Sequence, residues 1–294
     1  MTNTIGLIGI GLVGTAMVKS LLSRQFEIVG FDIDPERCAE FEKLYGKLAT
    51  KPAEVAGQVE FVILSLPDSK AVRQVIEGPK GLLEAEPLPK YIIDTTTGDP
   101  EETIALAERL TQRGITMLDA TISGSSRQVR DRVAVFMVGG DKTAFETCSN
   151  IFDALSEKVF YVGPSGHGSK AKLASNLILG LNRLVLAEGL IFAEKLGLDP
   201  AAFLELIKTT PAYSAIMDIK GEKMLEGDFT PQARIRQHRK DVFLILKHAE
   251  EAGQELPLSK VHLDVLDKAI AAGDADLDNA AVIKELRRRC SHPS

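Results

Sequence analysis

The hydrophobic pattern divides this chain of 294 residues into two parts. Up to about residue 165, short apolar runs alternate with segments of helical spacing. After Asn176 every pattern is helical, and the first, over 177–195, is long and apolar. Short apolar runs that alternate with helices are typical of parallel strands buried on both faces. The pattern therefore predicts an α/β, Rossmann-type doubly wound domain over 1–164 and an all-helical domain over 165–294, built around the long helix.

Several residues follow directly on predicted strands, where polar groups are easily placed for binding. The predicted strands span 4–9, 26–31, 59–66, 91–94, 115–120, 133–138 and 159–162. Leu66, Pro67, Thr96, Ser123 and Gly124 lie at or just beyond strand ends. Ligands of open α/β sheets bind outside the carboxyl ends of the strands, so these residues are predicted to line a site. A strand stop at Pro67, a helix cap at Thr96 and an ordinary Ser/Gly loop are the structural alternatives.

A glycine turn joins the first predicted strand to the first predicted helix. It has the sequence Gly9-Ile10-Gly11-Leu12-Val13-Gly14, and Asp32 ends the next strand. In a dinucleotide site, the first glycine allows the tight turn, the second lets backbone approach the pyrophosphate, and the third lets helix pack on strand. The helix N-terminus then faces the phosphates. We expect Asp32 to accept hydrogen bonds from the adenosine ribose and to repel a 2′-phosphate, which favours NAD over NADP. A glycine-rich turn without a ligand is the alternative.

The stretch 163–176 begins as a Gly/Pro loop and continues into the long helix. Lys172 and Asn176 are four residues apart, which places them on one helix face. Lys170 is two residues from Lys172, which on a helix is nearly the opposite side. We therefore expect Lys172 and Asn176 to project together, where the two domains share an active site, and Lys170 to point elsewhere.

Composition and charge exclude several other classes of function. A net charge of -6 disfavours binding to nucleic acid or to an acidic membrane. Cys38, Cys148 and Cys290 are scattered, which indicates a reducing, cytoplasmic compartment. The chain starts without a signal-peptide pattern, and polar residues interrupt the long helix, so we expect no membrane span. The five histidines show no metal-ligand spacing, so no metal is expected. The long apolar helix is too long to be buried by the few helices after it alone, which predicts a homodimer or homotetramer; the central helix of a monomeric bundle is the alternative.

The sequence resembles the β-hydroxyacid dehydrogenase family, which includes 3-hydroxyisobutyrate dehydrogenase and tartronate semialdehyde reductase. The resemblance runs almost end to end. Besides the glycine turn, it rests on motifs in the same order and at family-like intervals: Ser65-Leu-Pro67, Asp94-Thr-Thr-Thr-Gly-Asp-Pro100, Asp119-Ala-Thr-Ile-Ser-Gly-Ser125, Gly166-His-Gly-Ser-Lys-Ala-Lys172-Leu-Ala-Ser-Asn176 and Lys240-Asp241. The resemblance implies an NAD(P)-dependent oxidoreductase that interconverts a 3-hydroxy acid and its semialdehyde or oxo acid by hydride transfer.

The resemblance also implies residue roles. Lys172 matches the catalytic general acid/base, and Asn176 matches a substrate-contacting asparagine. Ser123 and Gly124 match the turn that binds the substrate carboxylate. Thr96 matches a residue near the nicotinamide. Lys240 matches a lysine at the junction of cofactor and substrate, which Asp241 is expected to hold in place.

The sequence departs from the family pattern around two basic segments, 127–132 and 234–240. Thr121 replaces a common proline, and Arg132 stands where glycine is usual. The cationic side chains of these segments suggest a substrate with a second anionic or highly polar group: Arg127, Arg130, Arg132, Arg234, Arg236, His238 and Arg239.

Other activities on similar architectures are less consistent with the residues. Decarboxylating phosphogluconate enzymes carry histidines where this chain has Ser169 and Ser175, and they are much longer. Imine reductases usually lack the lysine found here as Lys172. A non-catalytic nucleotide-sensing or scaffold protein would have no need to keep Lys172 and Asn176.

Overall fold

The computed structural model describes residues 3–44 and 46–290, without the side chain of residue 290. The chain divides into two compact units, residues 1–172 and 173–294. This division falls inside a helix, while the boundary predicted at 164/165 falls just before it and stays a prediction.

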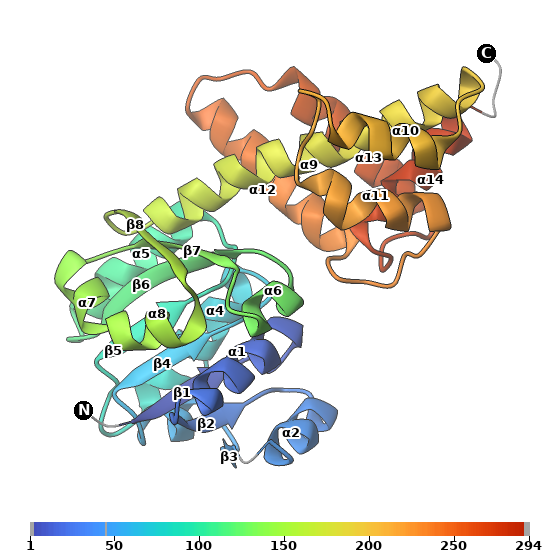
Figure 1. The fold of residues 1–294 in the computed structure, drawn as a ribbon. Helices are drawn as coiled ribbons and strands as arrows, with labels where there is room; N and C mark the ends of the chain where they lie inside the picture. Colours follow the sequence, from blue (N-terminus) through green and yellow to red (C-terminus); the bar gives the residue numbers. More distant parts are fainter. Residues whose placement is uncertain (1–2, 45, 291–294) are drawn as a thin grey trace. The chain divides into compact units, whose positions relative to one another are not determined.

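The first unit contains one eight-stranded sheet, drawn in blue to green in Figure 1. Its strands are β1 (Thr4–Ile8), β2 (Glu27–Phe31), β3 (Lys47–Leu48), β4 (Phe61–Leu64), β5 (Tyr91–Asp94), β6 (Thr116–Ser123), β7 (Val135–Gly139) and β8 (Lys158–Gly163). They are ordered β3-β2-β1-β4-β5-β6-β7-β8. All neighbours are parallel except β6 and β7, which are antiparallel. The predicted doubly wound fold is therefore confirmed, while the short strand β3 was not predicted because two residues carry no periodic signal.

Helices cover both faces of this sheet. They are α1 (Leu12–Ser23), α2 (Pro35–Glu42), α3 (Pro52–Ala56), α4 (Ser69–Glu77), η1 (Leu82–Glu84), α5 (Pro100–Thr111), α6 (Ser126–Arg130), α7 (Lys142–Thr147) and α8 (Ser149–Leu155). Helices α1, α6 and α8 lie on one face of the sheet (Figure 1), and their residues Met17, Val129 and Phe152 belong to one core. Val55 of α3 and Ile76 of α4 belong to the core on the other face. The strands β1, β4, β5, β6 and β7 are almost entirely buried on both sides, which explains their continuous apolar runs, whereas no residue of β8 is buried.

The second unit is all-helical, as predicted. It contains most of α9 (His167–Lys195), followed by α10 (Pro200–Lys208), α11 (Ile216–Glu226), α12 (Ile235–Glu251), α13 (Pro257–Ala271), η2 (Asn279–Ala281) and α14 (Val282–Cys290). Asp199 caps α10 through the Ala202 N–H at 2.7 Å, with Pro200 in the first turn, as the sequence indicates. By length and composition α9 could cross a membrane, which is weak evidence because half of its most apolar window is buried inside the protein.

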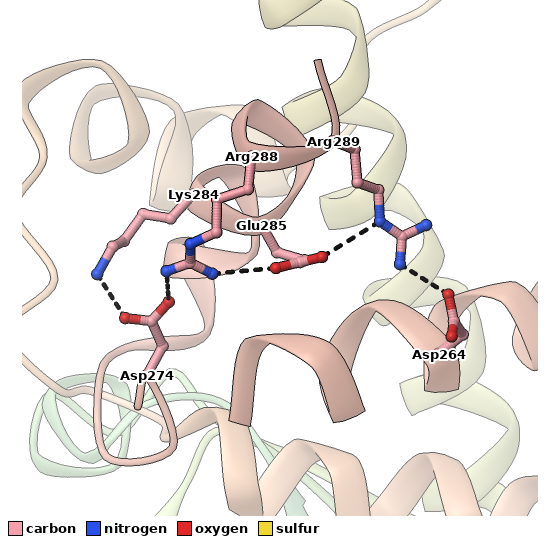
Figure 2. Close-up of polar contacts among 6 residues, drawn as sticks. All are labelled: Asp264, Asp274, Lys284, Glu285, Arg288 and Arg289. Carbon is pink, nitrogen blue, oxygen red and sulfur yellow. Dashed lines mark hydrogen bonds and ion pairs between the residues drawn. The ribbon is translucent and has the colours of Figure 1, made fainter. Parts of the chain in front are cut away.

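A network of ion pairs ties α14 to α13 and to the turn between them (Figure 2). Asp274 accepts from both Lys284 and Arg288. Arg288 also contacts Glu285 at 3.0 Å. Arg289 joins Glu285 at 3.3 Å to Asp264 of α13 at 2.7 Å. Because Asp274 and Glu285 are largely buried, each charge is balanced by at least one cation, as a buried carboxylate requires.

Candidate active site

The glycine turn lies where the strand order of the sheet reverses, between β1 and β4. Gly9 has φ +95, and a Cβ there would lie 2.2 Å from the Ser65 carbonyl oxygen. A Cβ on Gly14 would lie 2.0 Å from the Gly9 carbonyl oxygen. Both positions therefore require glycine, as the motif predicts. This end of the sheet is the crevice in which doubly wound folds bind their ligands.

The N-terminus of α1 is exposed and offers backbone N–H donors that suit a phosphate group. Gly11 is its N-cap, and no side chain caps the helix. The first-turn N–H groups of a helix lack partners within the helix and favour an anion. Leu12 is 66% exposed, so the turn is open to solvent. The residues present thus fit the pyrophosphate of a dinucleotide.

Asp32 directly follows β2 and is buried against the same turn. Its Oδ2 accepts from the Ile10 N–H at 2.6 Å, and its Oδ1 accepts from the Asp34 N–H at 2.9 Å. A carboxylate has about four lone-pair sites, so these two bonds leave it able to accept from ribose hydroxyls. Asp32 therefore shapes the glycine turn in addition to its predicted role.

Two of the predicted loop residues are hydrogen-bonded to each other. The Thr96 hydroxyl accepts from the Leu66 N–H at 3.2 Å, and the Thr96 N–H donates to Asp94 Oδ1 at 2.9 Å. The helix-cap alternative for Thr96 is wrong, because the side chain of Asp99 caps α5. The segments that follow β4 and β5 are thereby joined, which brings Leu66 and Thr96 together at the carboxyl ends of these strands.

The turn after β6 contains Ser123 at the strand end and Gly124, which is exposed and has φ +154. Ser125 is used locally: its hydroxyl and the Gln128 side chain form a capping box for α6. Gly124 therefore remains the open part of the predicted carboxylate turn.

Strand β6 holds the first turn of α9. Asp119 is 2% exposed; its Oδ1 accepts from the Gly166 N–H at 2.9 Å and its Oδ2 from the Ser169 N–H at 2.8 Å. The Thr121 hydroxyl donates to the Gly168 carbonyl at 2.8 Å, which gives the proline-to-threonine departure a structural purpose. Burial raises the pKa of Asp119, while the hydrogen bonds from the Ser169 and Gly166 N–H groups act in the opposite direction and lower it. Lys172 follows within one turn and is 8% exposed.

Lys170 points away from this buried side of the helix. Its side chain is about half exposed and lies 3.7 Å from Glu101 of α5. The predicted contrast between Lys170 and Lys172 is visible in their exposure.

The second unit brings Asn176 and Lys240 to one carboxylate. Asn176 Nδ2 donates to Asp241 Oδ2 at 3.0 Å, and Lys240 Nζ lies 3.4 Å from Asp241 Oδ1. The sequence suggested that Asp241 holds Lys240; the bond to Asn176 was not predicted.

A buried polar cluster continues along α9 from Asn176. Gly180 faces the His238 and His262 rings, since a Cβ there would lie 2.5 and 2.7 Å from them. The centroids of the two imidazole rings are 5.1 Å apart. Arg183 is 2% exposed, and among the described residues its Nε and Nη1 have no hydrogen-bond partner. Burial lowers the pKa of Arg183 to about 10, against the charges of Asp278 and Asp241.

His262 makes the stability of the helical unit depend on pH. Burial and then the Arg183 charge lower the pKa of His262 from 6.5 to about 4. Between these values the unfolded chain binds the proton and the folded chain does not, so stability falls as the pH falls. We expect a loss of about 3 kcal/mol between pH 7 and pH 4. Urea unfolding followed by circular dichroism should show this slope.

The variant His262→Gln cannot titrate in this range and should flatten that slope. At pH 8 both proteins have neutral residue 262, so the difference measured there reports packing alone. A slope that is unchanged in His262→Gln would contradict the assignment.

The arginines of the two basic segments already have partners. Arg234 and Arg236 pair with Asp276 at 3.6 and 2.8 Å, and Arg239 pairs with Asp267 at 2.7 Å. In the first unit, Arg127 and Arg130 pair with Asp131 at 3.6 and 3.1 Å. Arg132 has φ 58, a left-handed backbone conformation that glycine adopts easily, which explains why the family usually has glycine at this position. Its side chain donates to the Asp153 carbonyl at 2.6 Å.

Together, the fold and the glycine turn define a dinucleotide-dependent oxidoreductase. Residues 4–163 match the family model described as the NAD binding domain of 6-phosphogluconate dehydrogenase, and residues 166–286 match the NAD-binding model of NADP-dependent 3-hydroxyisobutyrate dehydrogenase. The chain belongs to the β-hydroxyacid dehydrogenase family and is an NAD(P)-dependent enzyme of that family.

Relatives match over nearly the whole chain. Glyoxylate/succinic semialdehyde reductase 1 of Arabidopsis thaliana is 29% identical, over 96% of this chain and 98% of its own length. The 2-hydroxy-3-oxopropionate reductase of Escherichia coli K12 is 29% identical, over 98% of each chain. The structure of Mycobacterium tuberculosis 3-hydroxyisobutyrate dehydrogenase with L-serine has a TM-score of 0.87 and 25% identity, covering 98% of this chain and all of the other. The general reaction is thus hydride exchange between NAD(P) and a hydroxy acid or its carbonyl counterpart.

Proposed function

We propose that this enzyme interconverts a small 3-hydroxy acid and its semialdehyde or oxo acid, with Lys172 as the general acid/base. The main support for the proposal is the position of Lys172. This lysine is nearly buried and lies on α9, whose first turn is held against β6 by hydrogen bonds with Asp119 and Thr121. A clamped helix turn keeps its side chain in one place, which proton transfer requires.

Each residue of the proposed site has a separate role in the reaction. The bound nicotinamide supplies or accepts the hydride. In reduction, Lys172 donates a proton to the carbonyl oxygen as negative charge develops there; in oxidation it removes the hydroxyl proton. Gly124 and Ser123 bind the substrate carboxylate through backbone N–H and hydroxyl groups. Asn176 and Lys240, which share Asp241, are proposed as further substrate contacts, with Lys240 also serving the cofactor.

The cofactor is proposed to be NAD in preference to NADP. Support comes from Asp32, whose buried carboxylate lies at the end of β2 against the glycine turn. The ribose of NAD offers this carboxylate two hydroxyl donors, whereas the phosphate of NADP brings a like charge. The family as a whole uses both cofactors, so the choice is a property of this chain.

A substrate panel tests the proposal. Absorbance of the reduced nicotinamide is followed with small hydroxy acids, their semialdehydes, dicarboxylic hydroxy acids and cyclic imines, each with NAD and with NADP. Turnover of hydroxy acids with NAD is the expected result. The dicarboxylic arm tests the second anionic group, for which the paired arginines provide little support. Turnover of cyclic imines alone, or dinucleotide binding without any turnover, would replace the proposal by the imine reductase or the sensing alternative.

We also propose that the enzyme is a cytoplasmic homo-oligomer formed through α9. Ile178, Val185 and Phe192 are 60, 66 and 63% exposed and follow each other at intervals of seven, which places them on one helix face. A cavity of about 310 Å³ beside Phe192, lined also by Ile191, Val261 and Val265, continues this apolar surface. A second copy would present the same apolar face, as in an isologous dimer.

Phe192→Glu should therefore weaken association. Burying a phenylalanine contributes about 1.5–3 kcal/mol, so the dimer should dissociate at least about tenfold more readily. Analytical ultracentrifugation at micromolar concentration measures this. Phe160→Glu is the matched control, since Phe160 is 56% exposed on β8 of the first unit. A wild-type protein that sediments only as a monomer would refute the oligomer.

A further inference from the structure

Arg183 is a buried cation of the helical unit that has no role in the proposed chemistry. It lies on α9 on the same helix face as Asn176 and Gly180, because residues at such spacings share one face. Arginine is rarely buried unless it is paired with an anion, yet Arg183 is 2% exposed. Among the described residues its Nε and Nη1 have no hydrogen-bond partner, so nearby anions must balance its charge.

This face of α9 packs along α12 in the antiparallel direction. Asn176 Nδ2 donates to Asp241 Oδ2 at 3.0 Å. One turn later along α9, a Cβ on Gly180 would lie 2.5 Å from Nε2 of His238, which precedes Asp241 on α12. Successive turns of α9 thus meet the turns of α12 in reverse order. This register places Arg183, one turn further along α9, near the start of α12.

Two buried carboxylates act on the Arg183 guanidinium. Asp278 lies near the start of α12, since it pairs in an isolated bridge with Arg234, the residue before this helix. Asp241 lies about two turns further along α12. Burial lowers the pKa of Arg183, while the charges of Asp278 and Asp241 act in the opposite direction and raise it. Arg183 is therefore within electrostatic range of both carboxylates.

The buried charges of this region alternate in sign. Lys220 Nζ lies 2.8 Å from Asp278 Oδ1, and Lys240 Nζ lies 3.4 Å from Asp241 Oδ1. Arg183 is a further cation that both carboxylates attract. Of the two cations near Asp241, Arg183 is the more deeply buried, because the Lys240 side chain is 26% exposed. Arg183 is thus the cation that stabilises the Asp241 carboxylate from inside the helical unit.

We propose that Arg183 is a positioning residue that acts through Asp241. Its charge holds the Asp241 carboxylate inside the helical unit, where that carboxylate accepts from the Asn176 amide. Without Arg183 the carboxylate loses a buried counter-charge and is drawn toward the more exposed Lys240, away from Asn176. The proposal rests on the proposed role of Asn176 as a substrate contact.

The first test needs no substrate and follows the Asn176 side-chain amide by NMR in the full chain, with isotope-labelled asparagine. Asn176→Ala identifies the signals of this amide. In Arg183→Met, which lacks the charge, the amide protons should exchange with water about tenfold faster, because their hydrogen bond to Asp241 is weakened. Arg183→Lys, which keeps the charge, should retain most of the wild-type protection. Unchanged exchange in Arg183→Met, or equal loss in Arg183→Lys, would overturn the proposal.

The second test measures steady-state kinetics with the hydroxy acid that the substrate panel shows to be turned over fastest. Arg183→Met should raise KM about tenfold with kcat nearly unchanged, because a substrate contact that is equal in ground and transition states acts on KM. A merely structural role would lower kcat through loss of folded enzyme and leave KM unchanged. Leu204→Ala is the matched control, since it leaves a cavity under α10 and destabilises the same unit. It should change neither KM nor the exchange of the Asn176 amide.

Asn176→Ala in the kinetic assay separates this inference from the proposed function. An unchanged KM in Asn176→Ala would remove the proposed substrate contact, and amide exchange alone would then decide the role of Arg183. A raised KM in Asn176→Ala together with a wild-type KM in Arg183→Met would overturn only the role of Arg183. If Arg183→Met does not fold, Arg183→Gln, which also lacks the charge, takes its place in both assays, and wild-type amide exchange in that variant would overturn the proposal.

Discussion

Replacing Lys172 with alanine should lower kcat by about 10²–10⁴-fold while the protein still binds NAD. The expected loss is large because the carbonyl oxygen gains negative charge during hydride transfer. In the variant this oxygen has neither the proton donor nor the stabilising cation that Lys172 provides. Cofactor binding should persist because the glycine turn and Asp32 are held by contacts that do not involve Lys172. Steady-state kinetics and NADH fluorescence titration measure the two effects separately.

Lys170→Ala is the matched control for this experiment. Lys170 lies on the same turn of α9, is exposed and contacts Glu101, so its loss should leave turnover nearly unchanged. Lys172→Arg adds a second comparison, since arginine keeps the positive charge but cannot release its proton near neutral pH. Wild-type turnover in Lys172→Ala, or equal losses in both alanine variants, would overturn the role of Lys172.

Replacing Lys220 with methionine should destabilise the helical unit by about 3–5 kcal/mol. Lys220 Nζ lies 2.8 Å from Asp278 Oδ1, and the Asp278 side chain is fully buried. Asp278 also accepts from the Gln232 N–H at 2.8 Å and the Ala280 N–H at 3.0 Å, so it joins separate segments of the unit. Removing the ammonium leaves a buried carboxylate without its nearest cation, which costs more than the lost contact itself. Urea unfolding measures the change.

Lys223→Met on the same helix is the control. Lys223 contacts Asp228 at 2.6 Å, and Asp228 is largely exposed, so water can replace the lost contact. Lys223→Met should therefore lower the free energy of unfolding much less than Lys220→Met. Equal destabilisation by both variants would show that burial of the Lys220 pair does not set its energetic importance.

Much of the fold and part of the candidate site followed from local sequence. The glycine turn was predictable because the requirement for glycine at Gly9 and Gly14 comes from backbone geometry within a few residues. The contrast between Lys170 and Lys172 followed from helical spacing alone. Strand β3 and the antiparallel direction of β7 did not, since two residues give no period and strand direction depends on long-range pairing.

Other functional contacts carried no signal that local reasoning could use. Asp119 was visible only as the first residue of a family motif, and its bonds to the start of α9 join residues 47 and 50 positions away. The arginines of the basic segments suggested an anionic substrate, whereas aspartates from other segments pair with several of them.

The sequence by itself determined most of the alternation of strands and helices, the dinucleotide turn and the face of α9 that carries Lys172 and Asn176, because each depends on spacing within one or two elements. Tertiary structure decided what holds those groups in place: Asp119 on the first turn of α9, Asp241 on Asn176, and Asp32 on the turn itself. These contacts join residues far apart in the chain, and burial gives them their strength, so they exist only once the sheet and the helices have packed.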